Sequence, residues 1–336
     1  MHFSKGYVIG LCLTAVYALQ SCKKKSTCRE HPDVSTLNST VTIERLDQRL
    51  FQCKDKKSIR LFLQEQPAFA HDIIEMDRYP SEEEAIDQLY KLTHDSYLDT
   101  LYQDTQHAFG DLAELQKEFQ QACRFMRYYY PSFKQPTFKS IVTGFAIDLY
   151  NQDSIVYIGL DYFVGPKAHY RPQGKPQYIL RRYQREYIVP TYVISLASSV
   201  NAYDPLDHTL LASMIYWGKT YYFAEHLLPC TPDSLIIGYT EDELQRAQAS
   251  ELAIWQHFLE KKLLFQSNPM VVSKYSDERP YTNEIGTKCP GRIAQWMGWQ
   301  IVRQYAKKKK CTLSDLMHTS NAQQIFEESG YRPTNK

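Results

Sequence analysis

Two runs in the middle of the chain decide its fold class: Phe138-Lys-Ser-Ile-Val-Thr-Gly-Phe145 and Ser154-Ile-Val-Tyr-Ile-Gly-Leu160. Both runs are rich in β-branched and aromatic residues, which favour strands. Between them, Asn151-Gln-Asp153 has the composition of a tight turn. The rest of the chain has the spacing of helices. The sequence therefore predicts an α+β protein that is predominantly α-helical, with one small antiparallel sheet.

Helical patterns lie on both sides of these strands. The first is predicted over residues 42–63. A second begins after Ser81, a helix-capping residue followed by three glutamates, and carries apolar residues as far as Leu101. A third runs from Gly110 towards Pro131 and is predicted to pair with the second as an antiparallel hairpin. A loop is predicted at 266–288, and the later helices are predicted at 178–199, 206–228, 241–265, 290–307 and 321–329.

The N-terminal residues have the pattern of a lipoprotein signal. Lys5 is followed by an apolar run, Tyr7 to Ala18, of roughly a dozen residues, shorter than the ~20 needed to span a bilayer. The sequence Leu19-Gln-Ser-Cys22 then places a cysteine directly after a small residue, as lipoprotein signal peptidase requires. We predict that residues 1–21 are a signal peptide and that Cys22 becomes the acylated, palmitate-bearing N-terminus of a lipid-anchored protein.

Residues 22–40 follow the acylation site and are mostly polar. They contain Lys23, Lys24 and Lys25 together with many serines and threonines. Such a composition has too few apolar groups to offset the entropy lost on ordering. We therefore predict a flexible tether at 22–40 and a single domain at 41–336. The three lysines either contact anionic lipid head groups or are simply solvated.

The charge balance bears on nucleic-acid binding, and the cysteine content bears on disulfide formation. Lys and Arg total 39 against 38 for Asp and Glu, and loss of Lys5 with the signal leaves 38 of each. No net positive field attracts nucleic acid. Of eight cysteines, Cys12 is lost with the signal and Cys22 carries lipid. The others allow many pairings, or free thiols, and the sequence leaves their state open: Cys28, Cys53, Cys123, Cys230, Cys289 and Cys311.

Several blocks of the chain resemble the gliding motility lipoprotein GldB family, over nearly all of the mature sequence. The blocks are Tyr157-Ile-Gly-Leu-Asp-Tyr-Phe-Val-Gly165, Arg185-Glu-Tyr-Ile-Val-Pro190, Met214-Ile-Tyr-Trp-Gly-Lys219, Ala253-Ile-Trp-Gln-His-Phe258 and Pro290-Gly-Arg-Ile-Ala-Gln-Trp-Met-Gly-Trp299. The resemblance implies an envelope lipoprotein of bacteria that glide or use the associated secretion machinery, with envelope proteins as partners. It implies no known reaction.

The resemblance also suggests where the protein is held. In this lineage, lipoproteins sent to the cell surface carry acidic residues just after the acylated cysteine. This chain has Lys23 to Lys25 there instead. The expected position is therefore the periplasmic face of a membrane, the outer membrane rather than the inner one.

The family is in turn similar to zinc metallopeptidases that carry His-Glu-x-x-His on a helix below a strand. That chemistry needs two imidazoles one helical turn apart, a glutamate base and a third ligand. On this sequence Arg185 and Val189 occupy the histidine positions, Glu186 the base position and Trp217 the third ligand position. An arginine and two apolar groups cannot hold Zn²⁺. The resemblance therefore implies a degenerate zincin-like domain without catalytic residues, metal or cofactor.

What remains is a predicted groove for a ligand or partner, with charged residues placed beside tryptophans. Its residues are Arg185, Glu186, Lys219, Arg292, Trp217, Trp296 and Trp299. The simpler interpretation is a structural network of ion pairs inside a helical core. We predict a noncatalytic lipoprotein that binds envelope partners. The alternatives are a cryptic metal-dependent hydrolase that uses Glu186, and a peptidoglycan or glycan binder that uses the three tryptophans.

A second cluster of polar residues is a weaker candidate for a functional site. Asp204, Asp207 and His208 are close in sequence and could together bind a metal. They stand just ahead of a predicted helix, where carboxylates commonly cap the free backbone N–H groups. Capping is the preferred interpretation.

Overall fold

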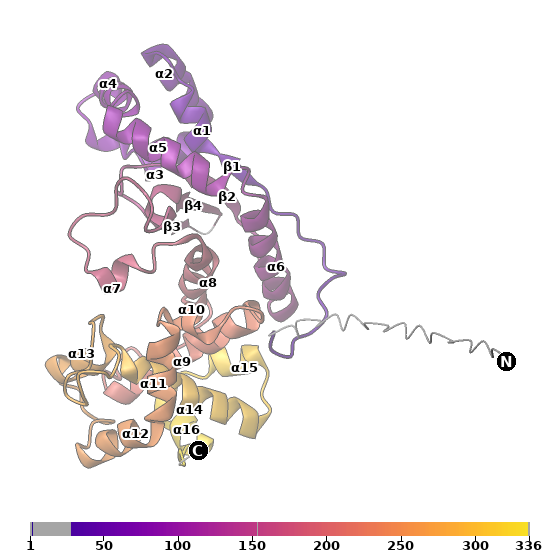
Figure 1. Cartoon of the computed structure of the whole chain (residues 1–336), viewed down its shortest axis with the longest axis vertical. Coiled ribbons are helices and arrows are strands. Elements are labelled where there is room, and N and C mark those ends of the chain that lie inside the picture. The colour runs from indigo at the N-terminus through magenta and orange to yellow at the C-terminus, as the bar shows by residue number, and fades with distance from the viewer. Residues whose placement is uncertain (1, 3–27, 153, 335–336) are drawn as a thin grey trace.

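The computed structural model describes residues 2, 28–152 and 154–334. The predicted signal peptide and the predicted acylation site at Cys22 lie outside the described residues. Figure 1 shows an elongated molecule, with the sheet and the N-terminal helices at one end and a helical C-terminal half at the other. The prediction of a mostly helical α+β protein is confirmed.

The sheet has four strands in the order β1-β2-β4-β3. β1 (Ile43–Arg45) and β2 (Thr137–Ile141) are parallel, as are β2 and β4 (Ile155–Gly159), whereas β3 (Leu149–Gln152) is antiparallel to β4. The sheet is therefore mixed, and the prediction of a purely antiparallel sheet is wrong. Only the hairpin around the predicted turn at 151–153 is antiparallel.

The pairing differs from the prediction because β3, the next strand after β2 in the chain, does not pair with β2. β4 follows β3 and lies between the two in the sheet. Gly159 makes this arrangement possible, since a Cβ atom there would collide with the backbone carbonyl oxygen of Ile147. Its backbone N–H instead donates to the carbonyl of Asp148 at 2.9 Å. A glycine is needed here for close backbone approach, which a pattern of strand propensities does not reveal.

A buried carboxylate fixes the start of the segment between β2 and β3. Asp161, in the short helix η2 (Leu160–Phe163), is 1% exposed and accepts hydrogen bonds from the backbone N–H groups of Thr143 (3.1 Å) and Phe145 (2.8 Å). Gly144 and Phe145 both have positive φ, 70° and 65°. Burial raises the pKa of Asp161 to about 6. The carboxylate therefore stabilises a backbone conformation that L-residues rarely adopt.

The N-terminal helices surround this sheet. The predicted helix over 42–63 is wrong at its start, because Ile43–Arg45 forms β1 and the helix is divided by Asp55, which caps the second part. The helix predicted from Ser81 to Leu101 is also divided, since Asp95 accepts from the backbone of Tyr97 and Leu98 and begins a new helix. The elements are α1 (Leu46–Phe51), α2 (Lys56–Glu65), α3 (Pro67–Asp72), η1 (Met76–Arg78), α4 (Glu82–Thr93), α5 (Ser96–Phe109) and α6 (Ala113–Tyr129).

The helix predicted over 178–199 is three separate pieces: α7 (Gln177–Leu180), η3 (Arg185–Tyr187) and α8 (Ile188–Ala197). A β-bridge between Val164 and Gln184 separates the first two. Pro190 lies in the first turn of α8, where its missing N–H costs no helical hydrogen bond. The predicted single helix is therefore wrong, and of its pieces α8 packs against β3.

The C-terminal half is built around two long helices, α9 (Leu210–Leu227) and α14 (Ile293–Lys309). They cross at Gly218 and Gly298. A Cβ on Gly218 would collide with the backbone of Gly298, and one on Gly298 would collide with the backbone of Met214. The predicted helix over 241–265 is divided at Ser250, and the predicted loop at 266–288 contains a helix. The remaining elements are α10 (Asp233–Ile237), α11 (Glu241–Ala249), α12 (Glu251–Glu260), α13 (Pro269–Ser276), α15 (Leu313–His318) and α16 (Ala322–Ser329).

The described part of the predicted tether is attached to this half. Cys28 forms a disulfide with Cys230, and the backbone N–H of Arg29 donates to the carbonyl of Pro229 at 2.8 Å. Val34 is buried in the main hydrophobic core. From Cys28 onward the segment is thus held on the domain, contrary to the predicted tether. Among the described residues the free thiols are Cys53, Cys123, Cys289 and Cys311.

Candidate functional site

The predicted groove residues do not meet in one place. Arg185 lies in η3, and its guanidinium forms an ion pair with Glu118 of α6 at 3.0 Å. Glu186 follows it and is exposed to solvent. Neither residue lines the pocket that contains Arg292 and Trp217. The grouping of Arg185 and Glu186 with that pair is therefore wrong. Their neighbour Tyr187 lines the pocket, but Arg185 pairs with α6 and Glu186 is exposed to solvent.

Two of the predicted tryptophans belong to the core. Trp296 is 1% exposed and Trp299 is fully buried. The guanidinium of Arg303 lies over the Trp299 ring at 4.0 Å from its centroid. α14 is covered by α9, α13 and α16, so its aromatic residues are enclosed from several sides. Neither tryptophan can contact an external ligand in this structure, and their assignment to a groove is wrong.

Lys219 is buried on α9, away from Arg292. Its ammonium group donates to the backbone carbonyls of Ala202, Met317 and Thr319, the last at 2.8 Å. Burial lowers the pKa of Lys219 to about 8. The three acceptors join α9 to the segment before it and to the end of α15. Lys219 is thus a structural residue of the helical core, with backbone carbonyls as its partners where the simpler interpretation predicted ion pairs.

Arg292 and Trp217 do share a cavity, of about 480 Å³, here called the Arg292 pocket. It lies among α8, α9, α10 and the start of α14. Its lining includes tyrosine and tryptophan rings and aliphatic side chains. The lining residues are Arg182, Tyr187, Pro190, Thr191, Ile194, Trp217, Tyr221, Leu235, Ile236, Ile237, Gly238, Ser276, Asp277, Glu278, Arg292 and Gln295.

One end of the Arg292 pocket is charged. Arg182 holds Glu278 in a bidentate pair, with both N–O distances 2.8 Å, and the Nε of Arg292 lies 3.2 Å from the same carboxylate. Burial opposes the ionisation of Glu278, but Arg292 and Arg182 outweigh it and lower its pKa. Arg292 also donates to the hydroxyl of Tyr221 at 3.2 Å. The end is therefore an organised cation–carboxylate cluster that is ionised at neutral pH.

The backbone around this cluster is unusual. Arg292 itself has a φ of 58° at the start of α14, and Gly238 has a φ of 73° at the end of α10. A Cβ on Gly238 would lie 2.6 Å from Cδ of Arg182. Strained backbone of this kind persists only where the surrounding structure supports it, and it is often found at functional sites.

Sequence reasoning missed most of the Arg292 pocket. Glu278 lies in a segment without periodicity, 14 residues before Arg292, and nothing in that segment marks it as an ion-pair partner. Arg182 precedes η3 in a stretch that the sequence assigned to the helix over 178–199. The only available signals were Trp217 and Arg292, in blocks that had already drawn attention by their resemblance to a family.

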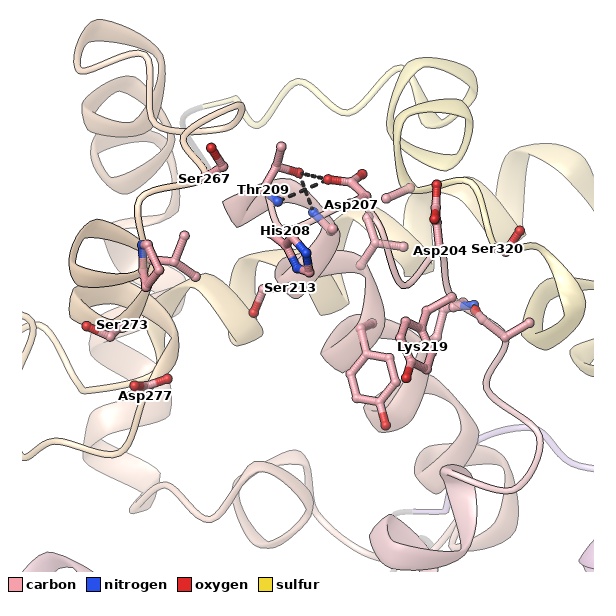
Figure 2. A pocket seen from close by; sticks show the side chains of 18 residues that line it. Asp204, Asp207, His208, Thr209, Ser213, Lys219, Ser267, Ser273, Asp277 and Ser320 are labelled. Atoms are coloured by element: carbon pink, nitrogen blue, oxygen red, sulfur yellow. Dashed lines mark hydrogen bonds between the residues drawn. The ribbon is translucent and has the colours of Figure 1, made fainter.

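A second cavity, of about 560 Å³, lies beside Lys219. Figure 2 shows its labelled residues, which come from α9, from α13 and the residues on either side of it, and from the segments that precede α9 and α16. Asp207 accepts hydrogen bonds from the backbone (3.0 Å) and hydroxyl (2.7 Å) of Thr209, and Asp204 accepts from the backbone of Leu206 (2.9 Å). The two carboxylates therefore stabilise the turn before α9. The cap itself is Thr209, whose hydroxyl accepts from the backbone of Ala212 at 3.1 Å, so the capping interpretation named the wrong residues.

Searches for two other features apply to the described residues. Across 28–152 and 154–334, no three His, Cys, Asp or Glu side chains gather where they could hold a metal ion. In that same portion of the chain, no helix has both the length and the apolar character needed to cross a bilayer.

Comparison with models of known families shows the family of the chain. The family model described as gliding motility protein GldB matches residues 27–333. The chain belongs to the GldB family. No curated protein and no solved structure matches it. Membership in the GldB family fits a role in gliding motility, and the lipoprotein character of the family fits attachment to the cell envelope.

Three of the blocks that resemble GldB proteins converge in the structure. Arg185–Pro190 supplies Tyr187 and Pro190 to the Arg292 pocket, Met214–Lys219 supplies Trp217, and Pro290–Trp299 supplies Arg292 and Gln295. The second and third blocks also contain the two glycines at the α9–α14 crossing. Three of the five segments that carry the resemblance therefore contribute to one pocket, and two of these three form the α9–α14 crossing.

Proposed function

We propose that this GldB-family protein is a noncatalytic envelope lipoprotein that supports the gliding or secretion machinery by binding a partner protein through the Arg292 pocket. The proposed position is the periplasmic face of the outer membrane, with the acyl chains on Cys22. The observation that carries the proposal is the convergence of three family-resembling blocks on one pocket with aromatic and charged walls.

The residues at the metal-ligand positions support a noncatalytic role. The guanidinium at the first histidine position, Arg185, pairs with Glu118, and the side chain at the second, Val189, is 2% exposed within the core. Trp217, at the third, forms part of the pocket wall. We interpret the helix α8, which packs on β3 and is followed by α9, as the remnant of a zincin-like arrangement.

The Arg292 pocket suits a segment of a partner protein. Trp217 is nearly stacked on the buried ring of Tyr221, with ring centroids 6.0 Å apart, and together with Ile194 it offers a surface for an apolar side chain. At the charged end, a carboxylate of the partner could take the place of Glu278 between Arg182 and Arg292. Buried aromatic and arginine side chains are the residues that most often dominate protein–protein affinity.

The glycan alternative is disfavoured by burial. Stacking on sugars requires exposed ring faces, and of the three tryptophans only Trp217 is partly accessible. One partly buried ring is a small platform for a polymer such as peptidoglycan. The hydrolase alternative, which depends on Glu186, is addressed by the zinc measurement in the Discussion.

In-cell photocrosslinking tests the proposed function. A photoreactive phenylalanine analogue at Leu235, a half-buried residue of the pocket, is expected to give a discrete protein adduct after irradiation. The same analogue at Leu61 on α2, which is 57% exposed and outside the pocket, is the control. Trp217→Ala should reduce the Leu235 adduct. Equal labelling from both positions would contradict the proposal, and adducts to sacculi in place of protein would favour glycan binding.

A further inference from the structure

The disulfide fixes which face of the domain lies nearest the lipid anchor. Five residues separate Cys22 from Cys28, and a chain of that length spans at most about 20 Å even when fully extended. Cys28 must stay within that distance of the acylated residue, and its disulfide with Cys230 keeps the segment just after α9 in the same region. This step depends on the proposed acylation of Cys22.

A buried cluster of charged side chains holds the end of α9 in place. Arg29 and Arg303 both pair with Glu225 and Asp233, with Arg29 to Glu225 at 3.9 Å and Arg303 to Asp233 at 2.8 Å. These four side chains join the segment after Cys28 to α9, α10 and α14. Arg303, six residues before the end of α14, is therefore held close to the segment that follows the disulfide.

Three lysines at the C-terminal end of α14 form no ion pair within the part of the chain that the structure describes. Lys307 lies one helical turn beyond Arg303 and so projects from nearly the same side of α14, and Lys308 and Lys310 follow it. All are exposed. The fourth lysine of the run, Lys309, is paired with Glu328 at 3.0 Å, and the nearby Asp315 is occupied in the cap of α15.

A tyrosine lies at the same end. The ring of Tyr129, in the last turn of α6, lies 5.8 Å from that of His226, in the last turn of α9, so the ends of the two helices are adjacent. Its neighbour Tyr128 is 49% exposed. Tyrosine is favoured at membrane interfaces, where its ring is apolar and its hydroxyl stays hydrated.

We propose that this tethered face, defined by Lys307, Lys308, Lys310 and Tyr128, docks on the anionic head groups of the leaflet that holds the acyl chains. Its positive charge complements that surface, and the short connection between Cys22 and Cys28 keeps it within reach. Each lysine near an anionic surface strengthens binding by about fivefold. The protein would then stand on its membrane in one orientation, with α2 at the end far from the tethered face (Figure 1).

Lysine footprinting of the full acylated chain tests this orientation. The protein is reconstituted in phosphatidylcholine vesicles with or without 30% phosphatidylglycerol and is acetylated briefly before mass spectrometry. Lys307, Lys308 and Lys310 are expected to react about fivefold or more slowly in the anionic vesicles, and 1 M salt should restore their rates. Lys57 on α2 and Lys261 after α12 are exposed internal controls whose rates should not change.

The same sample distinguishes the proposed membrane docking from the proposed acylation of Cys22. If intact mass shows an acylated chain whose three lysines react equally in both vesicles, docking is overturned while the lipid anchor stands. If Cys22 carries no acyl group, the anchor itself is overturned, and the inferred orientation is overturned with it. Protection of Lys57 in place of Lys307 would show that the opposite end faces the membrane.

Discussion

The variant Gly298→Ala is expected to accumulate little folded protein, or to lose more than about 4 kcal/mol of unfolding free energy. A methyl group at this position would overlap the backbone of Met214 on α9. No side chain rotation relieves such a clash, because both partners are main chain in helices. α9 and α14 would have to separate, and the largest hydrophobic core lies around them.

Thermal unfolding of purified protein, monitored by circular dichroism, measures this effect. Gly286→Ala is the matched control, since a Cβ there has no atom within 4 Å. The control should melt within about 1–2 °C of the parent protein. A Gly298→Ala protein that melts with the control would show that the two helices do not cross as described.

Loss of the Cys28–Cys230 disulfide is expected to cost about 2–5 kcal/mol of unfolding free energy. The bond links residues 202 positions apart, so it restricts a very long loop in the unfolded chain. The double variant Cys28→Ser/Cys230→Ser, and the parent protein in reductant, should both unfold at lower denaturant concentration than the oxidised parent.

Cys311→Ser controls for the loss of a thiol, since Cys311 is free and partly exposed. It should unfold close to the parent protein in the absence of reductant. If the oxidised and reduced parent proteins had the same midpoint, the disulfide would be either absent or without influence on stability.

Local signals in the sequence predicted the helices better than the sheet. The start of α4 followed from Ser81, whose hydroxyl accepts from the backbone of Glu84 at 3.2 Å. β1 was missed because Ile43 continues the apolar spacing of Leu46 and Leu50. Its strand pairs in parallel with β2, more than 90 residues later, and no local pattern records such a partner.

The candidate site was predicted only in part, for a related reason. Trp217 and Arg292 were identified and do share a pocket, but Trp296 was assigned to the same groove although it is enclosed by neighbouring helices. A tryptophan beside charged residues in sequence carries no information about which side of its helix is covered. Glu278 was not identified, because its role depends on a contact with Arg182, 96 positions away.

Zinc content tests most directly the claim that this GldB-family chain binds partners and does not hydrolyse them. The full chain, equilibrated with zinc and freed of loosely bound metal by gel filtration, is compared with Glu186→Ala and with Glu260→Ala, an exposed glutamate on α12. We expect far less than one zinc per chain in all three proteins. One tightly held zinc per chain that is lost in Glu186→Ala and kept in Glu260→Ala would contradict the claim.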